Sequence, residues 1–195
     1  SRGTEFRSVG ARPSTPLGLS GGPLPVPATL SRARCYVALG TNLGDRLLNL
    51  AEARRRLALL GEHLPGPVLE TAALLPPGDR TPQPKYLNSV DQLDTTLGPL
   101  ALFRELKRIE RQMGRVLTTR WAPRIIDLDL ILHGDAVVES PELTVPHPAM
   151  HQRRFVLEPL ALLAPNARHP VLGQSARELL KRVSRPPERV LGERA

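Results

Sequence analysis

The stretch Ile125-Ile-Asp-Leu-Asp-Leu-Ile-Leu132 is an apolar run interrupted by two acids, Asp127 and Asp129. Side chains alternate between the two faces of a β-strand, so this pattern predicts both carboxylates on one face, about 6 to 7 Å apart. The other face carries Ile126, Leu128 and Leu130, which indicates a core on that side. Two like charges held side by side cost energy unless a cation joins them, and this favours a divalent-metal site.

Three arginines lie shortly before this strand, at Arg115, Arg120 and Arg124. Guanidinium groups bind phosphate oxygens in a bidentate manner, so acids and arginines together indicate a metal–polyphosphate site. The chain has no Gly-x-x-x-x-Gly-Lys-Ser/Thr motif, which excludes a P-loop as the nucleotide site. Two alternatives stay open, namely an edge strand with one solvated face and an arginine-rich loop that is only surface.

Apolar periodicity and turn residues predict alternating strands and helices on both sides of this strand. The expected elements are, in chain order, a strand at 35–39, a helix capped by Asn42 or Asp45 and stopped by Gly61, strands at 68–75 and 86–95, a helix from Pro99 to Gly114, the 125–132 strand with a hairpin partner at 136–138, and helices at 153–163 and from Ser175. The order β-α-β-β-α-β is the split βαβ arrangement. It predicts an α/β sandwich with a mainly antiparallel sheet.

Residues 1–34 are rich in Pro, Gly, Ser and Arg and lack sustained apolar periodicity, so we expect a disordered tail there and one domain over 35–195. The tail carries half of the net charge of +8, and the mildly basic remainder argues against a nucleic-acid-binding module. No apolar run reaches the ~18 residues of a membrane span. We expect a soluble, cytoplasmic protein, with organelle targeting by the tail left open.

Two further clusters carry polar chemistry. Tyr86 and Asn88 alternate onto one face of their expected strand, where a ring and an amide can stack on and hydrogen-bond a flat heterocycle. His147 lies in a proline-rich loop before Arg153 and Phe155, and its imidazole can donate to a phosphate. A structural role is the alternative for both Tyr86 and His147.

Taken together, these residues resemble the hydroxymethyldihydropterin pyrophosphokinases of folate biosynthesis. The resemblance covers about residues 35–165 and is carried by Ala38-Leu-Gly-Thr-Asn-Leu-Gly-Asp45, Tyr86-Leu-Asn88, Arg120-Trp-Ala-Pro-Arg-Ile-Ile-Asp-Leu-Asp-Leu-Ile131, and Thr144-Val-Pro-His-Pro148 with Arg153 and Phe155. It implies a three-layer α-β-α sandwich with a ferredoxin-like core. It also implies transfer of pyrophosphate from ATP to 6-hydroxymethyl-7,8-dihydropterin, giving AMP and the pterin diphosphate.

The resemblance assigns roles to individual positions. Asp127 and Asp129 would bind two Mg²⁺ ions. The implied phosphate-binding, catalytic residues are Arg115, Arg120, Arg124, His147 and Arg153. The implied pterin-binding residues are Tyr86, Asn88, Phe155 and Trp121. Positions near the nucleotide are Glu110, Leu130, Thr144 and again Trp121. The implied partners are the two substrates and other folate-pathway enzymes, with neither nucleic acid nor membrane.

The chain departs from the family pattern in three places. Leu117 stands where a second arginine is frequent, which puts one phosphate contact in doubt. The loop from Pro76 to Pro84 carries an extra residue, and Leu75 before it replaces a common polar residue, so pterin contacts in this loop are not carried over. Glu142 stands where some members have arginine. The rival functions are another Mg-dependent phosphoryl or nucleotidyl transferase and a nucleic-acid-binding module; a nucleotide-sugar glycosyltransferase normally needs a larger nucleotide-binding domain.

Overall fold

The computed structural model describes residues 31–73, 83–115, 123–183 and 189–190 of the chain. Its helices and strands are β1 (Ala33–Thr41), α1 (Arg46–Leu57), β2 (Glu62–Leu64), β3 (Leu69–Thr71), β4 (Tyr86–Thr95), α2 (Pro99–Gln112), β5 (Asp127–His133), β6 (Val138–Glu139), β7 (Thr144–Val145), a 3-10 turn (Met150–Gln152), α3 (Arg154–Leu163), α4 (Ala176–Arg182) and β8 (Arg189–Val190). The first strand therefore begins two residues before the expected start of the domain.

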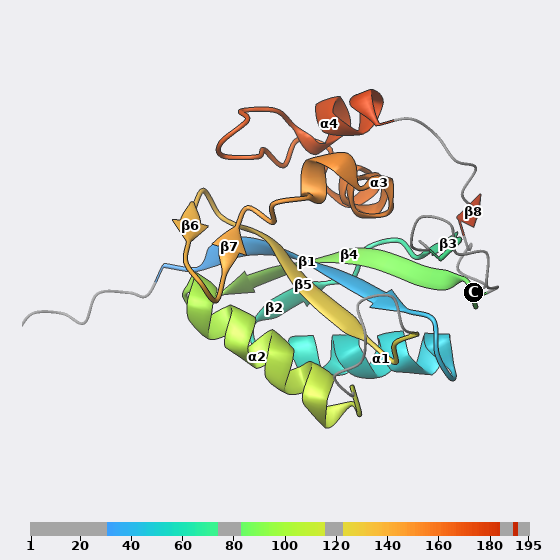
Figure 1. Ribbon diagram of the computed structural model, residues 1–195. Helices are drawn as coiled ribbons and strands as arrows, with labels where there is room; N and C mark the ends of the chain where they lie inside the picture. Colours follow the sequence, from blue (N-terminus) through green and yellow to red (C-terminus); the bar gives the residue numbers. More distant parts are fainter. Residues whose placement is uncertain (1–30, 74–82, 116–122, 184–188, 191–195) are drawn as a thin grey trace, which may run out of the picture. The chain divides into compact units, whose positions relative to one another are not determined.

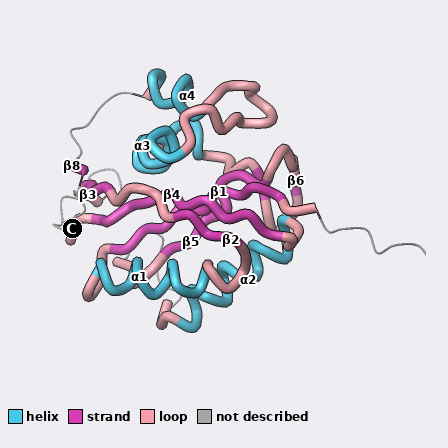
Figure 2. The backbone as a smooth tube through the Cα atoms, turned by 180° about the vertical axis from the view of Figure 1, so that it is seen from behind, coloured by secondary structure: helices cyan, strands magenta, loops and turns pink. Residues whose placement is uncertain are grey.

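A six-stranded sheet forms the centre of the fold, with the order β5-β1-β4-β3-β8 and with β2 also paired to β4. Every pairing among the described strands is antiparallel. Helices α1 and α2 cover one face and α3 and α4 the other, as Figure 1 and the reverse view in Figure 2 show. The layers and strand order confirm the α-β-α sandwich with a ferredoxin-like core.

The alternation of strand residues divides the core into two clusters, one on each face of the sheet. Leu39 and Leu128 pack with the apolar stripes of α1 and α2. Val90 and Ile131 pack with α3 and α4. The Ile126, Leu128 and Leu130 face of β5 is buried as predicted, so Asp127 and Asp129 lie on the face toward α3.

Several local predictions are confirmed at atomic detail. Asp45 caps α1, since its Oδ1 accepts from the backbone nitrogen of Leu48 at 3.0 Å. Gly114 follows α2 with a φ of 88°, a conformation that favours glycine. Ser175 and Glu178 form a complete capping box at the start of α4. Among the described residues, no helix has the length and apolarity that crossing a bilayer requires.

Two expectations are wrong, and one strand was missed. Helix α1 ends at Leu57, before Gly61, whose Cβ would lie 2.4 Å from the backbone oxygen of Asp94; close approach to β4 explains this glycine. The short strand β2, which directly follows, was not expected. The segment after β5 pairs with β7 in a separate two-stranded sheet, so it is not a hairpin partner of β5.

Candidate active site

The candidate site lies on the sheet face toward α3. Strand register places Asp127 of β5 beside Gly40 of β1, and Gly40 beside Asn88 of β4. Asp129 and Ala38 form the next row. Neighbouring strands are about 4.8 Å apart, so Asp127 and Asn88 stand about 10 Å apart. The small side chains on β1 leave a floor between a carboxylate on one side and an amide on the other.

A cavity of about 160 Å³ lies over this floor. The predicted site residues that line it are Tyr86, Asn88, Arg124, Asp127, Asp129, Arg153 and Phe155. They come from β4, from β5 and the residues before it, and from the start of α3. Residues that are up to 69 positions apart in the sequence thus share one pocket.

Two arginines hold the first acid. Asp127 accepts hydrogen bonds from Nη1 of Arg115 at 2.7 Å and from Nη1 of Arg124 at 2.6 Å. Burial alone would raise the pKa of Asp127, but Arg115, Lys107 and Arg124 outweigh it and lower that pKa. Asp129 has a weaker contact, 3.4 Å from Nζ of Lys107. Both acids therefore face the cavity beside cationic groups, with Asp127 held in its ionised form.

The donor set suits a hard divalent cation. Asp127 and Asp129 supply carboxylate oxygens, the ligands that Mg²⁺ prefers. Within the described ranges, no cluster of three or more His, Cys, Asp and Glu side chains exists that could enclose a metal. Two carboxylates leave most coordination positions to other oxygens, which fits a Mg²⁺ ion shared with phosphate groups.

Glu110 supports the acidic strand from α2. Its side chain is only 3% exposed, and its Oε1 accepts from the backbone nitrogen of Leu128 at 2.6 Å. Lys107 donates to both Glu110 and the Leu128 carbonyl, each at 2.8 Å. β5 is an edge strand of the sheet. Glu110 and Lys107 therefore supply hydrogen-bond partners for the N–H and the C=O of Leu128, the residue between the two acids. Burial raises the pKa of Glu110.

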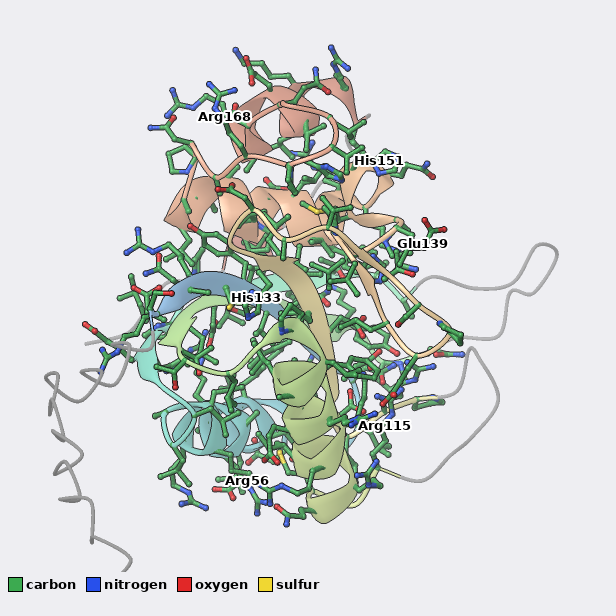
Figure 3. All side chains as sticks on the ribbon, turned by 90° about the vertical axis from the view of Figure 1, so that its left-hand side faces the viewer. Arg56, Arg115, His133, Glu139, His151 and Arg168 are labelled. Atoms are coloured by element: carbon green, nitrogen blue, oxygen red, sulfur yellow. The ribbon has the colours of Figure 1, made fainter. Side chains whose placement is uncertain are left out.

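Arg115 completes this arrangement at the end of α2, where Figure 3 labels it. It makes ion pairs with both Glu110 and Asp127. Lys107 was missed by the sequence analysis, because a single lysine on an amphipathic helix normally belongs to the solvated face. Its spacing of three residues from Glu110 was the one available signal.

His147 is held as a neutral hydrogen-bond donor. Its backbone nitrogen donates to the Ile131 carbonyl at 3.0 Å, and its Nδ1 accepts from the backbone nitrogen of Ala149 at 3.1 Å. Burial lowers the pKa of His147, although Asp129 acts in the opposite direction. With Nδ1 acting as acceptor, the neutral ring carries its proton on Nε2, which is then a donor.

Asn42 joins two segments that carry predicted site residues. It was expected as a possible helix cap, but its Oδ1 accepts from the backbone nitrogen of Arg124 at 2.8 Å. Its Nδ2 donates to the Pro84 carbonyl at 3.3 Å, two residues before Tyr86. Sequence reasoning could not find this link, because its partners lie 82 and 42 positions away.

The remaining predicted residues occupy different surroundings. The Arg153 guanidinium lies 5.8 Å from the centroid of the Phe155 ring. Leu130 is 3% exposed and packs in the core, whereas Thr144 is exposed on β7. Arg120 and Trp121 lie outside the described residues, as do Leu75 and Leu117 and most of the Pro76–Pro84 loop. Their roles stay predictions.

Comparison with known proteins identifies the family. The model of the 7,8-dihydro-6-hydroxymethylpterin-pyrophosphokinase (HPPK) family matches residues 36–165. The chain belongs to the HPPK family. It is similar to the 2-amino-4-hydroxy-6-hydroxymethyldihydropteridine pyrophosphokinase of Pseudomonas aeruginosa, with 43% identity over 139 residues that cover 70% of this chain and 84% of that protein.

Longer relatives also match. The mitochondrial folate synthesis bifunctional protein of Pisum sativum is 45% identical over 126 residues, which cover 64% of this chain and 24% of that protein. This chain thus spans about a quarter of the pea protein's length. A crystal structure of an HPPK-DHPS in complex with substrates superposes with a TM-score of 0.60 at 13% identity, covering 77% of this chain and 44% of that one. That likeness supports the fold alone.

Proposed function

We propose that this HPPK-family chain transfers pyrophosphate from ATP to 6-hydroxymethyl-7,8-dihydropterin, giving AMP and the pterin diphosphate in folate biosynthesis. The observation that carries the proposal is the row Asp127–Gly40–Asn88 across the sheet. It puts the ionised carboxylate of Asp127 and the amide of Asn88 at opposite sides of one cavity. An enzyme that transfers part of a polyphosphate to an alcohol on a flat heterocycle needs a phosphate-binding group and a heterocycle-binding group side by side.

The pterin end lies over β4 and α3. Tyr86 and Phe155 would stack on the two faces of the heterocycle, and Asn88 would hydrogen-bond its polar edge. All three side chains line the cavity, and burial raises the pKa of the Tyr86 hydroxyl, which keeps it neutral. The family resemblance adds Trp121 as a residue that closes over the substrate.

The phosphate end lies over β5. Asp127 and Asp129 would hold two Mg²⁺ ions, which when bound neutralise triphosphate charge. Arg115 and Arg124 would turn from Asp127 to the phosphate oxygens, since metal binding replaces their charge at that acid. His147 would donate from Nε2, and Arg153 and Arg120 would bind further phosphate oxygens. These groups stabilise the charge of the phosphates, and the protein forms no covalent intermediate.

In the transfer, the pterin hydroxymethyl oxygen attacks the β-phosphorus of ATP. The bond between that phosphorus and the oxygen bridging to the α-phosphate breaks, AMP leaves with that oxygen, and the alcohol proton passes to solvent. The residues of this chain align the two substrates and exclude water. For the nucleotide we propose contacts from Thr144 and Trp121, with Glu110 and Leu130 supporting β5 from its buried side.

The fused relatives suggest a working context. Because the chain matches about a quarter of a bifunctional folate synthesis protein of pea, we propose that it acts together with other folate-pathway enzymes. A partner enzyme of this kind would accept the pterin diphosphate as its substrate.

The deciding experiment measures AMP formed from Mg-ATP with and without 6-hydroxymethyl-7,8-dihydropterin. We expect AMP and pterin diphosphate in equal amounts, and neither without pterin. AMP that forms equally without the pterin would instead identify another Mg-dependent phosphoryl or nucleotidyl transferase. Removal of Mg²⁺ with a chelator should stop the reaction, and added Mg²⁺ should restore it.

A further inference from the structure

Strand β3 holds the amide of Asn88 from the side. Nδ2 of Asn88 donates to Oγ1 of Thr71 at 2.7 Å, and both residues are 7% exposed. Strand register pairs Thr71 with Tyr86 and Leu69 with Asn88, so Thr71 is the diagonal neighbour of Asn88 on the same face. The nitrogen end of the amide is therefore directed toward β3.

The oxygen end of the same amide lies over β1. A Cβ added at Gly40 would be 3.2 Å from Oδ1 of Asn88 and 3.8 Å from the Tyr86 ring. Gly40 has no positive φ, so the space above it explains the glycine, whereas backbone conformation does not. The Oδ1 atom thus occupies the floor of the cavity that Gly40 and Asn88 both line.

We propose that Thr71 is a positioning residue that holds the Asn88 side chain in place through the hydrogen bond from Nδ2 to Oγ1, so that Oδ1 lies over the cavity floor as an acceptor for the bound heterocycle. Thr71 supplies a hydrogen-bonding hydroxyl at this position, and a valine of the same shape would leave the Asn88 amide without this partner. The fixed amide selects heterocycles whose edge presents an N–H group at this point. The inference rests on the proposed pterin substrate.

The experiment measures equilibrium binding of 6-hydroxymethyl-7,8-dihydropterin by calorimetry. Thr71→Val keeps the shape but removes the acceptor, and we expect about tenfold weaker pterin binding, as for a buried donor left unpaired. Thr71→Ser restores the hydroxyl and should bind within about twofold of the parent protein. Affinity for a non-hydrolysable Mg-ATP analogue should change less than about twofold in both variants.

A double-mutant cycle with Asn88→Ala tests whether Thr71 acts through Asn88. We expect Thr71→Val to cause no further loss of pterin affinity in the Asn88→Ala background. Thr95→Val is the matched control for stability, because it removes a buried hydroxyl that bonds the Leu60 carbonyl at the far end of β4. It should lower the melting temperature and leave pterin affinity unchanged.

Three outcomes would overturn the inference: unchanged pterin affinity in Thr71→Val, an equal loss in the Asn88→Ala background, or an equal loss in Thr95→Val. The first two show that Asn88 does not depend on Thr71, and the third shows a general effect of stability. If the parent protein itself fails to bind the pterin, the proposed function is what fails.

Discussion

The backbone nitrogen of Leu128 donates a 2.6 Å hydrogen bond to the buried carboxylate of Glu110, and this contact holds the peptide group between Asp127 and Asp129. The same carboxylate accepts from Lys107 and pairs with Arg115. The geometry of the candidate metal site therefore depends on a side chain from α2, a different element of the fold, that is not among the residues lining the cavity.

Glu110→Ala should destabilise the protein by about 3 kcal/mol, because it leaves Lys107, Arg115 and the Leu128 nitrogen without their buried partner. Urea unfolding measures this. The control is Glu105→Ala on the same helix, where the lost partner is the exposed Arg108; its effect should stay below about 1 kcal/mol. Equal losses in the two variants would contradict a special role for Glu110.

Asp127→Asn and Asp129→Asn should each lower turnover by about 100-fold or more, since each removes charge that would hold Mg²⁺ at the transferring phosphates. Circular dichroism should show an intact fold. Asp94→Asn removes a strand carboxylate that pairs with Arg34 outside the cavity, and it should retain activity. Near-normal turnover in either site variant would remove the basis of the metal assignment.

Stability should fall in acid through Asp91. This carboxylate is fully buried and accepts hydrogen bonds from Arg54 at 3.0 Å, Ser89 at 2.8 Å and the Gly66 nitrogen at 3.0 Å, and it lies 2.9 Å from His63 Nε2. Burial alone would raise the pKa of Asp91, but His63 and Arg54 outweigh it and lower that pKa.

Because the pKa of Asp91 is lower in the folded state, the unfolded chain binds more protons between the two values. The stabilisation from Asp91 is present above the unfolded pKa of about 3.9 and is lost as pH falls through the folded value. Urea unfolding at a series of pH values from neutral to acid should show this loss. Asp91→Asn should make the free energy of unfolding depend less steeply on pH in acid. An unchanged dependence would show that other carboxylates cause the loss of stability.

Cys35 should be chemically inert in the native protein. It is fully buried in β1, and burial raises the pKa of its thiol to about 12. Only the thiolate attacks disulfide reagents, so labelling at pH 8 should be slow and should follow unfolding. Rapid labelling of the folded protein, with unchanged circular dichroism, would show that β1 is more accessible than the structure indicates.

The sequence by itself determined features that depend on neighbours a few residues apart. The period of two in 125–132 placed Asp127 and Asp129 on one face and Leu128 in the core, because strand geometry alternates side chains wherever the strand lies. The Ser175–Glu178 capping box and the glycine stop of α2 followed from equally local hydrogen bonding and backbone conformation. The family motifs supplied the remaining site residues.

Tertiary structure alone decided which of these local features meet. Asn88 reaches Thr71 across 17 positions, Lys107 reaches Leu128 across 21, and Asn42 reaches Arg124 across 82. The partner of β6 was mispredicted as β5, whereas β6 pairs with β7. A short apolar segment fits a pairing with either strand. Strand register and helix docking are set by burial over the whole sheet, so no local pattern specifies the row that joins Asp127, Gly40 and Asn88.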